Sequence, residues 1–558
     1  MFVSKKIKYS FQNKYIEENR YMKITFIGAT HQVTGSCTLL EWLPERYALI
    51  DYGMEQGINP YKQQDLPIPA SRIEYVFLTH AHIDHSGLLP LLYRNGFRGT
   101  VYATAETSNL SRIMLADSAQ IQETDAAYQT KKNLRTGAPE VLPLYTQTDA
   151  ENVSNLFSPC SYGKIYMVDE GLSVRFTDAG HLLGSSFVEL FLEDQGCRRK
   201  VVFSGDVGNL NQPIICDPSA VSEADYLIIE STYGDREHDT KADPIPMLTE
   251  ILRKTFSRGG TVIIPSFAVG RTQELLYFFR EIKQRNCLPE FSGFPVYVDS
   301  PLANEATAVF LQCGLECLDE DARRVLHEGE NPIWFEGLHT LTSAEESKRL
   351  NENPDYKVII ASGGMCEGGR IRHHLKHGLW NKNNTVLFAG YQAAGTLGRI
   401  IFDGAKSVKV LGEPIDVEAD ITLLEGISGH ADRKGLLNWI DRFETKPGYI
   451  FVNHGEDGVC SEFAGTITAR FSIPAKAPYS GSCYDLAAGE WVRITEPVLK
   501  DTENKEKIRK EEGSVRQARL YRELLSVADQ LESRIHQMKH CSNHSLEAMI
   551  NAIKKLMD

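Results

Sequence analysis

Four metal-binding side chains follow one short apolar strand, and this feature constrains the chain more than any other. The strand-like run YVFL leads into THAHIDHSG at 79–87, which holds His80, His82, Asp84 and His85. In an extended segment residues two apart project to the same side, so His80 and His82 can bind one cation together. The chain then turns and presents Asp84 and His85 to a neighbouring point. Imidazole and carboxylate groups hold a hydrolytic metal while leaving room for water, so the motif predicts a metal-dependent hydrolytic centre.

The pattern of apolar residues divides the chain into three segments that differ in their expected secondary structure. From Met22 to about residue 234, short β-rich runs end at Gly or Asp, with a polar helical stretch at roughly 104–135. From about Asp235, strands such as TVIIPSF are followed by helices such as GRTQELLYFFREIKQ, which predicts a parallel sheet with helices on its faces. From about 417 the sequence returns to the pattern of the first segment.

The H-x-H-x-D-H loop, with Asp51 at the end of an earlier strand (ALIDYG), resembles the metallo-β-lactamase superfamily. The large α/β insertion and two later histidines, in ISGHAD and VNHGE, resemble its β-CASP nuclease subfamily, in particular the cleavage-and-polyadenylation endonuclease type and its prokaryotic ribonuclease relatives. The resemblance covers roughly 22–498. It implies an α/β fold: an αββα sandwich with its metal site at one edge, an inserted β-CASP domain with a parallel sheet, and a helical C-terminal tail.

The same resemblance implies domain boundaries. They are an N-terminal extension at 1–21, the first part of the metallo-β-lactamase domain at 22–234, the inserted domain at 235–416, the second part of the metallo-β-lactamase domain at 417–498, and the tail at 499–558.

The resemblance also implies two Zn²⁺ ions. One would be held by His80, His82, His181 and Asp206, and the other by Asp84, His85, Asp206 and His454, with Asp84 also counted as catalytic. Taken without the resemblance, His181 could be a structural histidine and Asp206 a turn-forming residue. Two cations this close bind water as hydroxide and clamp the phosphoryl oxygens of an in-line displacement.

Three further residues are assigned supporting roles by the resemblance. Glu230 in LIIESTYGD and His430 in ISGHAD would form a proton-donating pair for the 3′-oxygen leaving group, with the carboxylate raising the pKa of the imidazole. Asp51 would hydrogen-bond a ligand histidine and fix its tautomer. The alternative is that Glu230 is a solvated strand-end acid and His430 an ordinary loop residue.

The inserted segment contributes candidates for binding the substrate backbone. Arg271 in PSFAVGRTQELL lies at a strand-to-helix junction, where free N–H groups and a guanidinium favour phosphate. The same argument applies to a second turn before a helix, in ASGGMCEGGR, which contains Ser362, Gly363 and Gly364. Glycine-rich turns also occur without any ligand, so these assignments depend on the resemblance.

The composition narrows the cellular setting. The chain carries 60 Lys and Arg against 74 Asp and Glu, a formal charge of −14, which argues against non-specific coating of nucleic acid. Two bound Zn²⁺ would supply a local positive field. No apolar run approaches the roughly 18 residues of a membrane-spanning helix, residues 1–21 lack a secretory apolar region, and eleven cysteines occur without a C-x-x-C pair. These features predict a cytoplasmic location and no membrane partner.

The resulting hypothesis is a zinc-dependent ribonuclease that hydrolyses single-stranded RNA, by endonucleolytic or 5′-exonucleolytic cleavage, to 5′-phosphate and 3′-hydroxyl ends. DNA-processing members of the subfamily usually have valine where this chain has His454, so His454 favours RNA over a DNA nuclease. A thioesterase or small-molecule phosphodiesterase on the same fold would lack the insertion, and an inactive scaffold would have lost metal ligands.

The last 60 residues predict a helical hairpin packed on the body or a dimerisation element. An apolar seam repeats at alternating spacings of three and four, and a second helix is expected at 546–557. The seam consists of Tyr521, Leu524, Ala528, Leu531, Ile535 and Met538. A homodimer would then form through the inserted domain or through these C-terminal helices.

Overall fold

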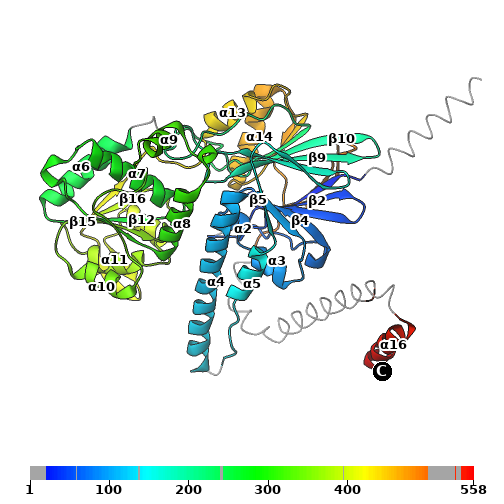
Figure 1. Cartoon of the computed structure of the whole chain (residues 1–558), viewed down its shortest axis with the longest axis horizontal. Coiled ribbons are helices and arrows are strands. Elements are labelled where there is room, and N and C mark those ends of the chain that lie inside the picture. The colour runs from blue at the N-terminus through cyan, green and yellow to red at the C-terminus, as the bar shows by residue number, and fades with distance from the viewer. Residues whose placement is uncertain are drawn as a thin grey trace, which may run out of the picture.

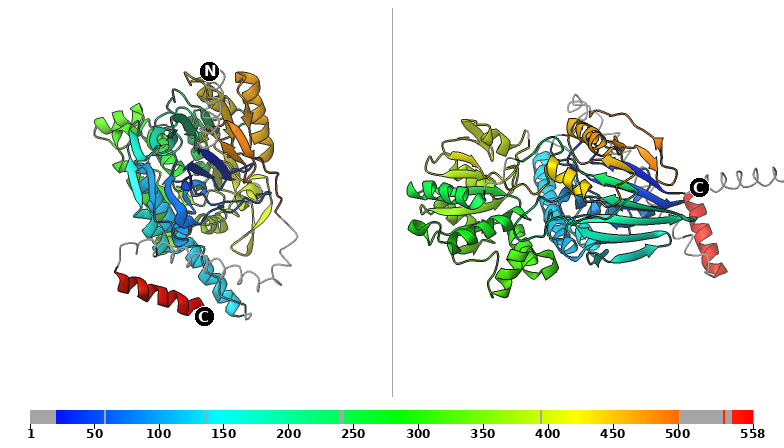
Figure 2. Two further views of the ribbon diagram at one scale, coloured as in Figure 1. Left: turned by 90° about the vertical axis from the view of Figure 1, so that its right-hand side faces the viewer. Right: turned by 90° about the horizontal axis from the view of Figure 1, so that it is seen from above.

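The computed structural model describes residues 21–57, 59–135, 138–238, 243–393, 395–500, 535 and 542–557. In this part of the chain, two stacked sheets with outer helices form one lobe, and a third sheet with its own helices forms a second lobe beside it (Figure 1). The view from above, on the right of Figure 2, also shows the two lobes side by side.

The first lobe contains one sheet of eight strands and one of seven. In spatial order the eight strands are β23 (Glu490–Arg493), β22 (Cys483–Asp485), β1 (Lys23–Gly28), β2 (Cys37–Leu43), β3 (Arg46–Ile50), β4 (Ile73–Phe77), β5 (Thr100–Thr104) and β6 (Phe157–Cys160). The seven strands are β21 (Ala475–Lys476), β20 (Tyr449–Val452), β11 (Tyr226–Ile229), β10 (Cys197–Phe203), β9 (Ser186–Asp194), β8 (Leu172–Asp178) and β7 (Ile165–Asp169).

Alternation along the strands explains why the sheets stack. In β10, Val201 joins the core between the two sheets, whereas its neighbour Val202 joins the core under the outer helices. The inter-sheet core is dominated by large side chains such as Phe26, Trp42 and Phe451, which are fully buried. Because each strand presents apolar residues to both sides, each sheet needs cover on both faces.

Helices supply that outer cover. The eight-stranded sheet is covered by α2 (Ile83–Ser86), α3 (Leu89–Arg94), α4 (Ala105–Leu134) and α5 (Gln147–Ser154), and the seven-stranded sheet by α13 (Arg433–Asp441) and α14 (Asp457–Phe471). The predicted helical stretch at 104–135 corresponds to α4, whose N-terminus is capped because the Thr104 side chain accepts a hydrogen bond from the Thr107 amide. The lobe is therefore the αββα sandwich expected from the sequence.

The second lobe is a parallel six-stranded sheet, as the alternation of strands and helices predicts. Its spatial order is β14 (Leu338–Thr340), β13 (Val296–Asp299), β15 (Lys357–Ser362), β12 (Thr261–Ser266), β16 (Thr385–Phe388) and β19 (Asp420–Leu423). Every pair of neighbours is parallel. One face packs on α6 (Pro244–Ser257), α7 (Arg271–Gln284), α8 (Pro301–Gln312) and α9 (Glu320–His327), the other on α10 (Ala344–Glu352), α11 (Ile371–Gly378) and α12 (Leu397–Phe402). A two-stranded ribbon of β17 (Ser407–Val410) and β18 (Glu413–Asp416) follows α12.

Strand pairing differs from the predicted boundary at 417. β19 pairs with β16 over Asp420–Leu423, so these residues complete the sheet of the inserted lobe. The sequence ADITLLEGI has the same apolar character as the strands of either lobe, and only the pairing distinguishes them. The chain returns to the sandwich after β19, through the loop that carries His430.

At the C-terminus, α16 (Asn543–Met557) corresponds to the expected helix at 546–557. Of the predicted seam, Ile535 is exposed, and its other five residues lie outside the described residues. The ten cysteines among the described residues are free thiols, and none of the described helices has the length and apolar character needed to cross a membrane.

Candidate metal centre

The carboxyl ends of several strands meet at one edge of the sandwich, and the predicted site residues lie in the loops that follow them. Asp51 follows β3, the His80–His85 segment follows β4, and His181 follows β8. In the other sheet β10, β11 and β20 are parallel neighbours, so Asp206, Glu230 and His454 follow adjacent strands at the same edge. Sheet direction therefore explains why residues far apart in sequence come together here.

The first group of ligand candidates consists of three imidazoles around one carboxylate. His80 Nε2 lies 3.1 Å from His82 Nδ1, and His181 Nε2 lies 3.2 Å from the same atom. The Oδ2 atom of Asp206 lies 3.4 Å from His80 Nε2 and 3.5 Å from His181 Nε2. Four ligand atoms thus surround one point, in the grouping expected for the first ion.

The second group lies on the other side of Asp206. His85 Nε2 lies 3.1 Å from His454 Nε2 and 3.4 Å from Asp206 Oδ1, and His454 Nε2 lies 3.6 Å from Asp84 Oδ2. The two oxygens of Asp206 face different groups, so this carboxylate is shared between them. The structure therefore brings together all seven predicted ligands.

Hydrogen bonds behind the ligands determine which nitrogen of each imidazole faces the centre. His85 Nδ1–H donates to Asp51 Oδ2 at 2.7 Å, and His80 Nδ1–H donates to Thr79 Oγ1 at 3.1 Å. His181 Nδ1–H donates to the carbonyl oxygen of Gly429 at 3.0 Å. In each ring the opposite nitrogen, Nε2, is left with its lone pair turned inward.

This arrangement fits a cation and is unfavourable without one. The Nε2 atoms of His80 and His181 both face His82 Nδ1 within 3.2 Å, and those of His85 and His454 face each other at 3.1 Å. The buried Asp206 Oδ1 has no hydrogen-bond donor. Buried acceptors that face one another are costly unless a positive charge lies between them, so the donor set suits metal ions.

Burial sets the protonation of the imidazoles in the first group, whereas for His85 the Asp206 and Asp51 carboxylates outweigh burial and raise the pKa. Burial and neighbouring imidazoles lower the pKa values of His80, His82 and His181, that of His82 to about 3. These rings are therefore neutral at physiological pH, which is the form that binds metal. Burial opposes the charged form of Asp206, but the surrounding histidines outweigh it and hold its pKa well below the usual range.

Glu230 and His430 form a pair beside the first group. The Glu230 carboxylate accepts backbone hydrogen bonds from Val207 at 2.6 Å and Thr232 at 3.3 Å, which fix its position. His430 Nδ1–H faces both Glu230 oxygens at 3.3 Å, and its Nε2 lies 3.9 Å from Asp206 Oδ2. Burial lowers the pKa of His430, but the Glu230 and Asp206 carboxylates outweigh burial and raise it to about 9.

Sequence reasoning missed several residues that position this site. Thr79, which directly precedes His80, donates its hydroxyl hydrogen to Asp51 and accepts from His80. The Tyr233 ring lies 6.1 Å from the His430 ring, edge to face. Thr79 lies inside the quoted motif and Tyr233 lies three residues after Glu230, but neither has a spacing that indicates its contact.

The predicted substrate-binding residues lie at the carboxyl edge of the inserted sheet. Arg271 opens α7 and forms an ion pair with Glu274, which is itself buried. Ser362 ends β15, and the Gly363 amide donates to the carbonyl of Ser266 at 3.2 Å, so this amide is already engaged. Gly364 lies under the aromatic ring of Phe267, because a Cβ atom at this position would meet the ring at 3.1 Å.

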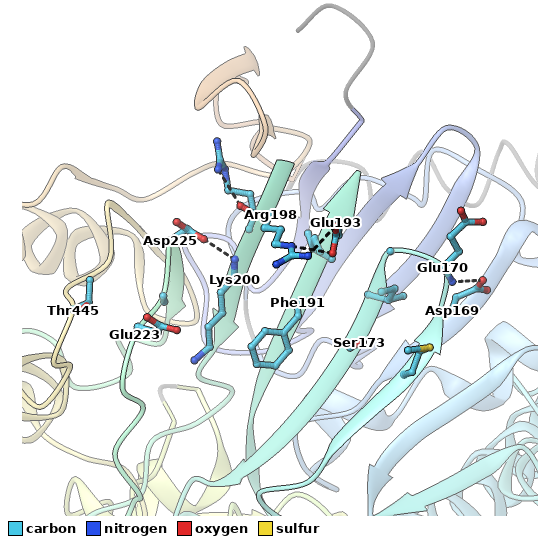
Figure 3. A pocket seen from close by; sticks show the side chains of 16 residues that line it. Asp169, Glu170, Ser173, Phe191, Glu193, Arg198, Lys200, Glu223, Asp225 and Thr445 are labelled. Atoms are coloured by element: carbon cyan, nitrogen blue, oxygen red, sulfur yellow. Dashed lines mark hydrogen bonds and ion pairs between the residues drawn. The ribbon is translucent and has the colours of Figure 1, made fainter. Parts of the chain in front are cut away.

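A separate cavity of about 550 Å³ lies near the opposite end of the seven-stranded sheet, around Phe191 and Lys200 (Figure 3). Two of its basic side chains form ion pairs: Arg198 with Glu193 at 3.0 Å, and Lys200 with the buried Glu189 at 2.7 Å. β10 runs from this cavity towards Asp206, so the cavity and the metal centre lie at opposite ends of the strand.

Comparison with known families identifies the class of this site and fold. Three protein families match parts of the chain. They are the metallo-beta-lactamase superfamily at residues 32–152, the Beta-Casp domain at 272–401, and the Zn-dependent metallo-hydrolase RNA specificity domain at 414–478. The combination defines a metal-dependent hydrolase fold split by an insertion.

Among curated proteins, the chain is 37% identical over 437 residues to "Ribonuclease TTHA0252" of Thermus thermophilus, covering 78% of this chain and 94% of that protein. It is 31% identical over 474 residues to "Transcription termination factor FttA" of Methanosarcina mazei, covering 82% and 71%. The FttA protein of Methanocaldococcus jannaschii is 30% identical, with 82% and 70% covered. The chain belongs to the metallo-β-lactamase superfamily, in its β-CASP family.

Proposed function

We propose that the protein is a ribonuclease that holds two Zn²⁺ ions and hydrolyses phosphodiester bonds of single-stranded RNA to 5′-phosphate and 3′-hydroxyl ends. The observation that carries the proposal is the shared carboxylate of Asp206, whose two oxygens face two separate groups of metal-binding side chains. The proposal includes endonucleolytic or 5′-exonucleolytic cleavage.

The ligand atoms suit two zinc ions in number and type. His80, His82, His181 and Asp206 would hold one ion, and Asp84, His85, His454 and the second oxygen of Asp206 the other. Two such ions supply a nucleophile from water at neutral pH and stabilise the charge of a phosphoryl group under attack.

The chain's own residues supply the remaining chemistry. His430 directs Nε2 towards the Asp206 side of the centre while its Nδ1–H is held by Glu230. From this position its protonated form can donate a proton to the departing 3′-oxygen, and Glu230 keeps the ring oriented and favours the protonated state. Asp51 and Thr79 fix the tautomers of His85 and His80.

An RNA substrate is supported by the names of the relatives and of one matched domain, which include a ribonuclease and an RNA specificity domain. His454 supports the same choice, since DNA-processing members of the family usually have valine there. A cytoplasmic location is part of this proposal, because the substrate would be cellular RNA. A homodimer remains an expectation from the sequence.

A time course on RNA labelled at either end, beside single-stranded DNA of the same sequence, tests the proposal. With zinc, the purified protein should cleave the RNA to products with 5′-phosphate ends, and a chelator should stop the reaction. A ladder of internal products would indicate endonucleolytic cleavage, whereas release of mononucleotides from the 5′ end would indicate the exonucleolytic mode.

Two substitutions in the second group sharpen the test. Asp84→Ala and His454→Ala should each abolish cleavage and reduce bound zinc from two equivalents towards one. His377→Ala removes a histidine from α11 in the inserted lobe and should leave zinc content and cleavage unchanged. Full activity in both Asp84→Ala and His454→Ala would refute the two-ion assignment.

A further inference from the structure

Several large aromatic side chains of the inserted lobe are exposed, and two of them lie at one edge of its sheet. Phe267 is 48% exposed and Tyr391 is 49% exposed. By contrast, Phe279, Phe294 and Phe388 are almost fully buried in the two cores of the lobe. Single exposed aromatic residues are common, so position and surroundings must decide whether these two have a role.

Both residues lie at the carboxyl edge of the parallel sheet, on neighbouring strands. Phe267 follows β12 and Tyr391 follows β16. Val262 pairs with Thr385 and Ile263 with Val386, so β12 and β16 are parallel neighbours and their carboxyl ends lie at the same edge. Adjacent strands lie about 4.8 Å apart, and open α/β sheets bind ligands at this edge.

The loops that carry the two rings are joined through a third segment, the turn after β15, whose Gly363 amide donates to the carbonyl oxygen of Ser266 at 3.2 Å. The buried Gln392 side chain donates from Nε2 to the carbonyl oxygens of Gly364 at 2.9 Å and Tyr391 at 3.1 Å. Gly364 in turn packs against the Phe267 ring, where a Cβ atom would be in tight contact at 3.1 Å. A platform held in this way loses little conformational entropy when a ligand binds.

The same loops adjoin the metal centre. Gly270, which follows Phe267 in this loop, lies against Leu182, the residue after the ligand candidate His181. Burial raises the pKa of Tyr233, and Arg236, Arg271 and Tyr391 are near enough to influence it electrostatically. Tyr233 itself packs edge to face against His430. The two exposed rings thus lie next to the residues expected to handle the scissile phosphate.

We infer that Phe267 and Tyr391 form a base-binding subsite, which stacks an unpaired nucleobase of RNA beside the scissile phosphate. Aromatic rings bind single-stranded nucleic acid by stacking, and this contact tolerates any base because every base has a π-face. The inference rests on the proposed RNA substrate and deepens it. It also gives Gly364 a role other than phosphate binding, as the support of the Phe267 ring.

Binding of labelled RNA to the full-length protein, measured by fluorescence anisotropy in an Asp84→Ala background that prevents cleavage, tests the inference. Phe267→Leu and Tyr391→Leu keep apolar volume but remove the ring, and each should weaken binding about 5- to 100-fold, the range of stacking energies per base. Tyr391→Phe should retain binding, because stacking needs the ring and not the hydroxyl.

The matched control is Trp380→Leu. Trp380 is 59% exposed on the same lobe but lies at the amino edge of the sheet, because the adjacent Leu379 carbonyl accepts from the residues that precede β19. This variant should bind RNA as tightly as its parent. An equal loss in Trp380→Leu would overturn the inference, because the loss would then have no link to the carboxyl edge.

A set of RNAs with one abasic ribose at each successive position locates the stacked base. One position should weaken binding to the parent by the same factor as Phe267→Leu, and that abasic RNA should lose no further affinity for Phe267→Leu, because both changes remove one contact. Additive losses at every position, or unchanged binding in both ring variants, would overturn the subsite. A protein that cleaves RNA without such a position would lose only this inference, whereas a protein that neither binds nor cleaves RNA would refute the proposed function and this inference with it.

Discussion

The substitution Asp51→Asn tests how far the residues behind the ligands organise the second group. The Asp51 carboxylate is buried and accepts four hydrogen bonds. Oδ1 accepts from the Thr79 amide at 2.8 Å, and Oδ2 accepts from His85 Nδ1–H at 2.7 Å, Thr79 Oγ1 at 3.0 Å and Ser36 Oγ at 3.3 Å. Every partner is a donor, so the site requires two acceptor atoms.

The side chain of asparagine offers only one acceptor atom, its amide oxygen. In either orientation its NH₂ group faces a donor. The orientation that keeps the hydrogen bond from His85 loses the hydrogen bond from the Thr79 amide. The backbone does not complicate the test, because Asp51 has a φ of 59° and asparagine tolerates this left-handed conformation as well as aspartate does. The shape of the side chain is unchanged.

The expected loss follows from these contacts. A hydrogen bond to a charged group contributes about 1.5–3 kcal/mol, and residues behind metal ligands typically change metal affinity about 10- to 100-fold, which equals about 1.4–2.7 kcal/mol. The two ranges agree. We therefore expect zinc binding by the group of Asp84, His85 and His454 to weaken about 10- to 100-fold, with little change in the other group.

Competition against a chromophoric chelator measures both affinities in one titration. The matched control is Asp299→Asn in the inserted lobe, a buried carboxylate that also contacts a histidine, His374, at 2.7 Å. This control should lower the melting temperature without changing zinc affinity. If Asp51→Asn likewise lost only thermal stability and kept two equally tight zinc sites, the reasoning about tautomer control would be wrong.

Three further predictions follow from other contacts. His430→Ala should keep two zinc equivalents and lower the cleavage rate about 10²- to 10⁴-fold, as loss of a general acid does; zinc loss in this variant, seen by metal analysis, would contradict its assigned role. Gly208→Ala should lose zinc, because its Cβ would lie 1.7 Å from the Gly180 carbonyl oxygen next to His181; Gly458→Ala, in open space, is the control, and normal zinc content in Gly208→Ala would contradict the expected collision. Burial raises the pKa of Glu189, but hydrogen bonds from Arg175 and its neighbours outweigh burial and lower it, so its contribution to stability is present above the unfolded pKa and is lost as the pH falls through the folded value. The difference in melting temperature between the wild type and Glu189→Gln should therefore shrink from pH 7 to pH 4 in calorimetry, and a constant difference would be inconsistent with this linkage.

The sequence predicted the fold well because its patterns are local and periodic. The strand ending at Phe77 and the parallel sheet of the inserted lobe follow from apolar spacing, and α4 corresponds to the polar helical stretch expected at 104–135. The boundary at 417 illustrates the limit, because β19 is assigned to a lobe by its partner β16, which lies outside its own sequence.

Only part of the site could be predicted from the residues themselves, and another part depended on the resemblance to a known family. The motif from His80 to His85 carries its own chemistry, whereas Asp206 and His454 became ligand candidates only through the resemblance. The Thr79 hydroxyl, the Gly429 carbonyl and the Tyr233 ring could not be predicted, since each contact depends on how distant loops fold over one another.

The split architecture has a consequence for synthesis of the protein. His454 follows β20, which pairs with β11 across the whole length of the inserted lobe in the sequence. A nascent chain that ends before β20 therefore has three imidazoles around one oxygen of Asp206 but lacks the last ligand on the other side. Under the proposed two-ion chemistry, a chain truncated before β20 would lack His454 and would not cleave RNA.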